Sequence, residues 1–194
     1  MAITIDGSGT ITGINAGGLP DGVITSDDLA SGAITSGALP AGSILQVVQA
    51  VKTDTFSDAQ SPPFTDWVDV PGLSVSVTPQ SASNKILVLA QISVVGSATQ
   101  PVAARLLRGS TAIFLADTAG SRTPSTVSVR HESGQALAAV PIMFLDSPST
   151  TSSTTYKIQV AGEGTVLVNR TGSDSDLSSF YRATSSITVM EVAA

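Results

Sequence analysis

The sequence of 194 residues predicts an all-β fold, in which an antiparallel β-sandwich of the jelly-roll type (residues 44–194) follows a short, extended and intertwined stalk (residues 1–43). Only 12% of the residues are charged, whereas 28 serines and 22 threonines are present. Disordered chains, coiled coils and long amphipathic helices need far more Glu, Lys and Arg. A ten-residue repeat near the start of the chain and period-two alternation after it are the other two observations behind this prediction.

Residues 1–43 differ in composition from the rest of the chain. They hold nine of the 17 glycines but no Lys, Arg or aromatic residue. Glycine recurs at ten-residue spacing (Gly22, Gly32 and Gly42), and isoleucine and leucine recur in phase with it. The Ile and Leu positions are Ile14, Leu19, Ile24, Leu29, Ile34, Leu39 and Ile44. Such an internal period favours a repeat architecture over an unstructured linker.

The repeat also predicts an oligomer. Burying one Ile and one Leu per ten residues contributes only a few kcal/mol, at ~25 cal/mol per Å² of apolar surface. Fixing ten residues costs more, because each backbone position loses roughly 1–2 kcal/mol of conformational entropy. We therefore expect the Ile and Leu side chains to be buried against identical copies around a common axis, as a short stalk of threefold symmetry.

The remainder of the chain alternates short strand patterns with turn signals. Leu73, Val75 and Val77 alternate with small polar residues, which is the pattern of a strand with one buried face. Gly- and Pro-containing pairs such as Pro71-Gly72 indicate the turns. The predicted strands are 44–52, 66–70, 73–78, 85–95, 102–107, 111–115, 125–130, 137–145, 154–161, 164–169 and 184–192. So many short strands are typical of a sandwich, here most simply a jelly roll.

Two of these strands carry positional information. Residues 85–95 are apolar at both alternating sets of positions, which predicts a central strand or one that packs against a neighbouring subunit. Residues 137–145 include Pro141, which lacks a backbone N–H. This strand is therefore expected at a sheet edge or at a bulge.

Composition excludes several classes of function. A net charge of -6 and nine scattered cations predict no nucleic-acid ligand, and the apolar runs are shorter than the ~18–20 residues of a membrane span. Cysteine is absent, His131 is the only histidine, and no G-x-S-x-G motif occurs, so we expect no enzyme and no cofactor. Asp174-Ser175-Asp176 offers too few ligands for a calcium loop, so no metal site is predicted.

Long loops on a rigid sandwich are where recognition usually resides. The loop 170–183 gathers charged and aromatic side chains that suit hydrogen bonding and stacking with a sugar or protein surface. Its candidate binding residues are Arg170, Asp174, Asp176, Phe180, Tyr181 and Arg182. The loop 56–67 contributes Phe56, Phe64 and Trp67, and packing in the core or an interface is the favoured interpretation for Phe64 and Trp67.

Several segments resemble a known family. ITSDDLASGA at 24–33 is similar to the I-T-x-x-x-L-x-x-G repeat near the N-termini of many bacteriophage fibre proteins. LPAGSILQVVQAVKTDTFS (39–57), RLLRGSTAI (105–113), FLDSPSTTSSTTYKIQV (144–160) and SSITVMEV (185–192) resemble segments of fibre and virion-surface proteins of marine phages, especially cyanophages. The resemblance therefore involves both the repeat region and the strand-rich region of the chain.

The resemblance implies a non-enzymatic, homotrimeric appendage on the virion surface, assembled in the host cytoplasm. Its N-terminus would dock on a structural protein of the tail or capsid, and its C-terminal knob would attach to a host-surface glycan or protein. Short tail fibre, spike and head fibre all fit, since the chain lacks the extended shaft of long tail fibres. The alternative is a capsid decoration or cement protein with a purely structural role.

Overall fold

The computed structural model describes residues 4–5, 11–12, 29, 34, 36–61, 66–97, 99–130, 132–133 and 135–194. The chain divides into two compact units, Met1–Leu39 and Pro40–Ala194, which we describe separately. Within the described residues, no helix has the length and apolar character that crossing a bilayer requires.

The first unit contains little regular structure among its described residues. Strand β1 (Thr4–Ile5) pairs antiparallel with β2 (Ile11–Thr12), and a single 3-10 turn, η2, spans Ser36–Ala38. This pairing is too short to bury a core of its own.

The repeat positions that the structure describes are exposed in the single chain. Their exposed fractions are 42% for Leu29, 55% for Ile34, 39% for Leu39 and 47% for Ile44. The other repeat positions, Ile14, Leu19 and Ile24, lie outside the described residues. Their role in oligomerisation stays a prediction.

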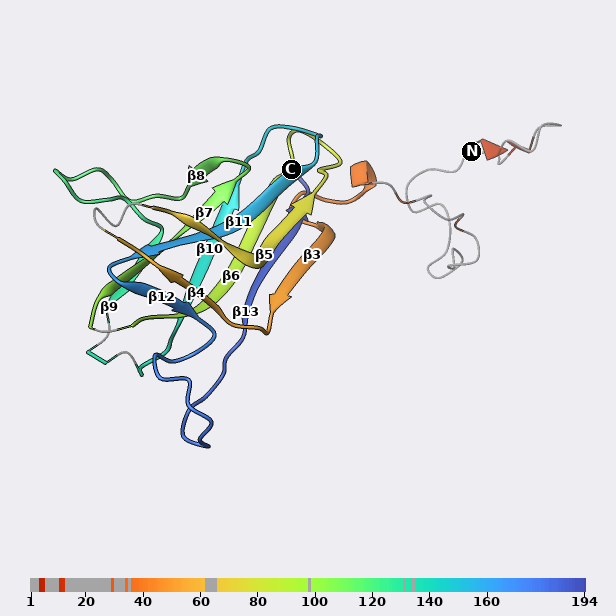
Figure 1. The fold of residues 1–194 in the computed structure, drawn as a ribbon. Coiled ribbons are helices and arrows are strands. Elements are labelled where there is room, and N and C mark those ends of the chain that lie inside the picture. The colour runs from red at the N-terminus through yellow and green to blue at the C-terminus, as the bar shows by residue number, and fades with distance from the viewer. Residues whose placement is uncertain are drawn as a thin grey trace. The chain divides into compact units, whose positions relative to one another are not determined.

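The second unit is a sandwich of two antiparallel sheets, which confirms the predicted fold class (Figure 1). The first sheet consists of β3 (Ile44–Lys52), β4 (Phe56–Ala59), β6 (Lys85–Gly96), β10 (Ala138–Asp146), β12 (Thr165–Val168) and β13 (Ser185–Val192). The second consists of β5 (Val68–Val77), β7 (Pro101–Arg108), β8 (Thr111–Ile113), β9 (Val127–Arg130) and β11 (Thr154–Gly162).

The strand order is that of a jelly roll. When β4, β8 and β12 are set aside, the strands pair from the outside of the sequence inward: β3 with β13, β5 with β11, β6 with β10, and β7 with β9. Two further pairings, β13 with β6 and β11 with β7, complete sheets of order β3-β13-β6-β10 and β5-β11-β7-β9. A long hairpin rolled into two layers gives this pattern.

The two positional predictions are confirmed. Strand β6 is central, with β10 on one side and both β13 and β12 on the other. Strand β10, which contains Pro141, pairs only with β6 and forms an edge. An edge position tolerates the missing N–H of proline.

Two details of the strand prediction are wrong. Residues 66–70 and 73–78 belong to one strand, β5, because Pro71-Gly72 forms a bulge instead of a turn. Along β11 the register changes from Lys157 opposite Ser74 to Gln159 opposite Asp69, and Gly72 adopts a φ of 83°. Strand β4 was not predicted; it is short, and its alternation covers only four residues.

The core lies between the sheets and is built from alternate residues of the central strands. Ile92, Leu106, Tyr156 and Ile187 are each 0% exposed. A polar contact also joins the layers: the Tyr156 hydroxyl donates to Asp146 Oδ2 at 2.6 Å. Figure 1 shows that the loop between β12 and β13 extends beyond this double layer, so the packed sheets act as its support.

Candidate binding site in the loop between β12 and β13

The base of the loop 169–184 is fastened to the first sheet. Ala183 N donates to Asn169 O at 3.2 Å, which closes the loop on itself, and Asn169 N donates to Ser93 O on β6 at 2.9 Å. The Ser93 hydroxyl in turn donates to Thr184 O at 2.9 Å. Both ends of the loop are therefore held by the central strand of the sheet.

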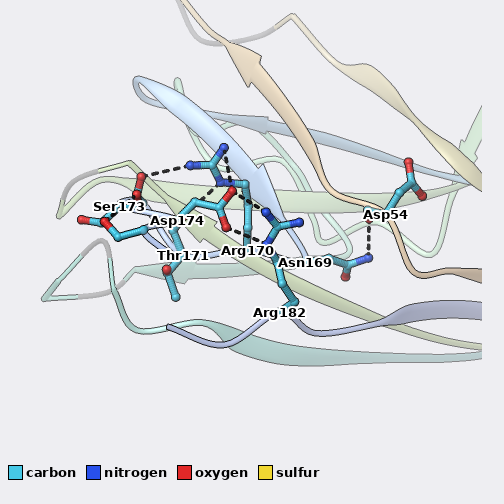
Figure 2. A network of polar contacts seen from close by, with 9 residues as sticks. Asp54, Asn169, Arg170, Thr171, Ser173, Asp174 and Arg182 are labelled. Atoms are coloured by element: carbon cyan, nitrogen blue, oxygen red, sulfur yellow. Dashed lines mark hydrogen bonds and ion pairs between the residues drawn. The ribbon is translucent and has the colours of Figure 1, made fainter. Parts of the chain in front are cut away.

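Asn169 is the main anchor of this base (Figure 2). It is 0% exposed and has a φ of 61°, a left-handed conformation that Asn tolerates better than most residues. Its Nδ2 donates to Lys52 O at 2.9 Å and to Asp54 O at 3.0 Å, and its Oδ1 accepts from Ser185 Oγ at 2.6 Å. One side chain thus joins the loop to β3, to the β3–β4 connection and to β13.

Above this base, two arginines converge on Asp174 (Figure 2). Arg182 binds the carboxylate in a bidentate manner, with Nε–Oδ1 and Nη2–Oδ2 distances of 2.6 and 2.7 Å. Arg170 Nη1 lies 3.6 Å from Oδ2, and its other nitrogens donate to Thr171 O and Gly172 O. Bidentate charge-assisted pairs of this kind fix geometry as well as contributing energy. They hold the loop in one shape.

The loop folds around a hollow of about 380 Å³. The residues that line it are Asp174, Ser175, Asp176, Leu177, Phe180 and Arg182. Two large side chains of this loop face solvent: Leu177 is 62% exposed and Tyr181 is 74% exposed. The neighbouring β9–β10 loop also reaches this region, because Gln135 Nε2 donates to Ser173 Oγ at 2.8 Å.

The arrangement suits binding by hydrogen bonds and stacking. Asp174 is engaged by two guanidinium groups, so the carboxylate that remains for a ligand at the hollow is the exposed Asp176. Ser175 adds a hydroxyl, and Tyr181 adds a ring with a polar tip. A polyhydroxylated or amide-bearing ligand matches these donors and acceptors.

The structure brings most of the predicted site residues together. Asp174, Asp176, Phe180 and Arg182 line one hollow, and Arg170 contacts it through Asp174. Tyr181 lies beside the hollow and does not line it. Receptor binding by this group stays a prediction.

Sequence reasoning missed two residues that shape this region. Asn169 follows a strand directly, and an Asn in that position is a signal for a left-handed residue that closes a loop. Gln135 carries no such signal, because its contact with Ser173 depends on how two distant loops meet.

The aromatic residues predicted in the 56–67 loop serve packing where the structure describes them. Phe56 packs against the core, and Phe64 lies outside the described residues. Trp67 is half-buried beneath Arg105, whose Cζ lies 4.4 Å from the ring centroid. This contact is a cation–π interaction.

The outer face of the second sheet carries a charged network next to Trp67. Arg105 donates to Gln159 Oε1, and Asp69 accepts from Gln159 Nε2 and Lys157 Nζ at 2.7 Å each. Burial opposes ionisation of Asp69, but the donors from Lys157 and Gln159 outweigh it and hold the pKa of this carboxyl below its ordinary value. Burial also lowers the pKa of Arg105, and the charge of Asp69 acts against that shift.

No cluster of three or more His, Cys, Asp or Glu side chains with the spacing of a metal site occurs among the described residues. His131 lies outside them. No protein-family model matches the chain. No curated protein is significantly similar to it.

Proposed function

We propose that this chain is a homotrimeric surface appendage of a bacteriophage virion, such as a short tail fibre, spike or head fibre. Its N-terminal repeats dock on a structural protein of the particle, and its jelly roll presents the loop 169–184 for attachment to a glycan or protein of the host surface. The resemblance to phage fibre segments supports the location. The geometry of the loop supports the attachment.

The observation that carries the proposal is the hollow in the loop 169–184, whose base is hydrogen-bonded to the first sheet. A loop that only connected two strands would not need a buried anchor, a doubly paired carboxylate and an exposed tyrosine within one short segment. Here Asn169 and Asp174 fix the backbone, whereas Asp176 and Tyr181 remain available. Preorganisation of this kind lowers the entropy cost of binding.

The test is adsorption of virions that carry Tyr181→Ala or Asp176→Asn to their host bacterium. We expect each substitution to lower adsorption about tenfold, since the loss of one good contact of ~1.4 kcal/mol changes an equilibrium by that factor. Leu115→Ala and Asp117→Asn are matched controls, because they make the same kinds of change at exposed positions of another loop.

The controls should adsorb like wild type. If the two loop variants also adsorb like wild type while remaining in the virion, the attachment role is wrong. The remaining role would then be that of a capsid decoration or cement protein, for which loop substitutions have no effect on adsorption.

A further inference from the structure

The outer face of the first sheet is apolar where a solvent-facing sheet is usually polar. Its four main strands lie in the order β10-β6-β13-β3, and their registers place Leu145, Leu87, Met190 and Val47 in one row across the sheet. Met143 and Leu89 flank this row on one side, and Val192 and Ile44 on the other. The exposed fractions are 68% for Met143, 56% for Val47 and 47% for both Leu145 and Ile44.

This face, which we call the apolar face, also lacks negative charge. The acidic residues of its strands, Asp146 and Glu191, point inward and are buried. Lys85, at the margin, is the charged residue that the four strands place on the outer side. The remaining positions are neutral. Gln49 Nε2 on β3 donates to Thr188 Oγ1 on the neighbouring strand β13 at 2.8 Å.

The second sheet provides an internal comparison. Its outer face carries the network of Asp69, Arg105, Lys157 and Gln159, which is the polar surface expected of a sheet in contact with water. Both sheets belong to the same sandwich in the same chain. The difference between their outer faces therefore indicates that the apolar face is covered in the assembled protein.

We propose that copies of this chain pack against one another through the apolar face. The chain carries a net charge of -6, so identical copies repel one another least where acidic side chains are absent, as they are on this face. Gln and Thr both donate and accept, so rows of these residues can pair with their own copies across a symmetry axis. A partner recognised by opposite charge would find almost no charge to pair with.

The place of the apolar face in the sequence also supports a second copy of the chain as its partner. Ile44 is the last isoleucine of the ten-residue repeat and also the first residue of β3 on the apolar face. The segment predicted to associate with its own copies therefore continues directly into this surface.

The size of the face fits a shared interface. Four strands at ~4.8 Å spacing and seven residues at ~3.3 Å per residue cover on the order of 400 Å². Stable complexes bury about 800 Å² per partner. The face thus supplies roughly half of such an interface, and the repeat segment would supply the remainder. A shallow hollow between Met143, Leu89 and Thr188 offers a place for a side chain of the neighbouring copy.

This inference deepens the proposed function and rests on its homotrimer, because it names the surface through which the copies would associate. The experiment is sedimentation velocity of the full chain over a range of concentrations. Wild type should sediment as a multiple of 19.5 kDa. Val47→Asp and Met143→Asp should each raise the concentration of half-dissociation at least about tenfold, because each would bury an unpaired charge in the interface.

Ser74→Asp is the matched control, since it adds the same charge at an exposed position on the outer face of the second sheet. It should leave the dissociation concentration unchanged. Circular dichroism checks the fold. If an aspartate variant unfolds, Val47→Thr or Met143→Gln takes its place. These milder variants should also raise the concentration of half-dissociation.

The inference fails if wild type is monomeric at every soluble concentration, or if folded variants of Val47 and Met143 associate like wild type. A monomeric wild type would also remove the homotrimer from the proposed function, whereas folded variants that associate like wild type would remove only the apolar face as its interface. The attachment role is tested separately. Tyr181→Ala should leave the sedimenting mass unchanged, so adsorption reports on the loop and mass reports on the apolar face.

Discussion

Asn169 shows how one residue converts a long loop into a defined surface. In the sequence it belongs to Asn169-Arg170-Thr171, which has the form of a glycosylation acceptor. In the structure its side chain is fully buried and makes three hydrogen bonds, two of them to backbone carbonyls of the β3–β4 region. The residue type is explained by the left-handed backbone and by the need for both a donor and an acceptor.

We expect Asn169→Ala to lower the free energy of unfolding by about 2–4 kcal/mol, because it removes these hydrogen bonds and places Ala in a left-handed conformation. Asn169→Gly removes the same bonds without the backbone strain and should cost about 1 kcal/mol less. Urea denaturation followed by tryptophan fluorescence measures both values. Equal losses for the two variants would contradict a contribution from backbone strain.

At the scale of elements, Glu191 ties three segments of the sandwich together. It lies on β13, is 0% exposed, and accepts from Gln46 on β3 at 2.5 Å. It also accepts from Gln80 N at 2.7 Å and from Asn84 Nδ2 at 2.6 Å, both in the β5–β6 connection. Burial disfavours the charged form, but the hydrogen bonds from Asn84, Gln46 and the backbone outweigh it and lower the pKa of Glu191 below 4.5.

This lowered pKa predicts a loss of stability in acid. The unfolded chain binds a proton at Glu191 near its ordinary pKa of 4.5, whereas the folded chain binds it only at lower pH. The contribution is therefore fully present above pH 4.5 and is lost as the pH falls through the folded value. Urea midpoints measured at several pH values should decline in this range, and Glu191→Gln should decline less steeply from a lower starting stability.

The comparison variant is Asp117→Asn, which changes an exposed carboxyl in a loop. It should follow the wild-type profile. If Glu191→Gln also keeps the full wild-type decline, other carboxyls such as Asp54 and Asp69, whose pKa values are lowered by Lys52 and Lys157 respectively, account for it.

Among the elements, some strands could be predicted from the sequence and other features could not. Strands with sustained alternation, such as β11, or a long apolar run, such as β6, were located to within one residue. Pro71-Gly72 was misleading, because a bulge and a turn use the same residues and only pairing with β11 distinguishes them. The loop 170–183 was predicted as a site from composition, but its anchor at Asn169 depends on contacts distant in sequence.

For the molecule as a whole, the two outer sheet faces define two environments. The charged face of the second sheet suits water, whereas the apolar face is the surface that we propose packs against copies of the chain. The loop 169–184 follows β12 and leads into β13, a strand of the apolar face. An assembly built on that face would therefore fix the loops of all copies relative to one another, which favours multivalent attachment.

The last prediction concerns the repeat segment. Replacement of both Ile24 and Ile34 by Asp should weaken association of the full chain, because each isoleucine is expected to contact its own copies and a charge there would repel them. The sandwich has its own core, so its circular dichroism and the unfolding of the monomer should not change.

Combination of these substitutions with Val47→Asp then tests whether stalk and face share one oligomer. If they do, the two losses in association free energy should add, since the substitutions remove different contacts of one oligomer. A repeat variant that associates like wild type, while Val47→Asp dissociates, would mean that the sandwich alone holds the copies together and that residues 1–43 serve as a tether.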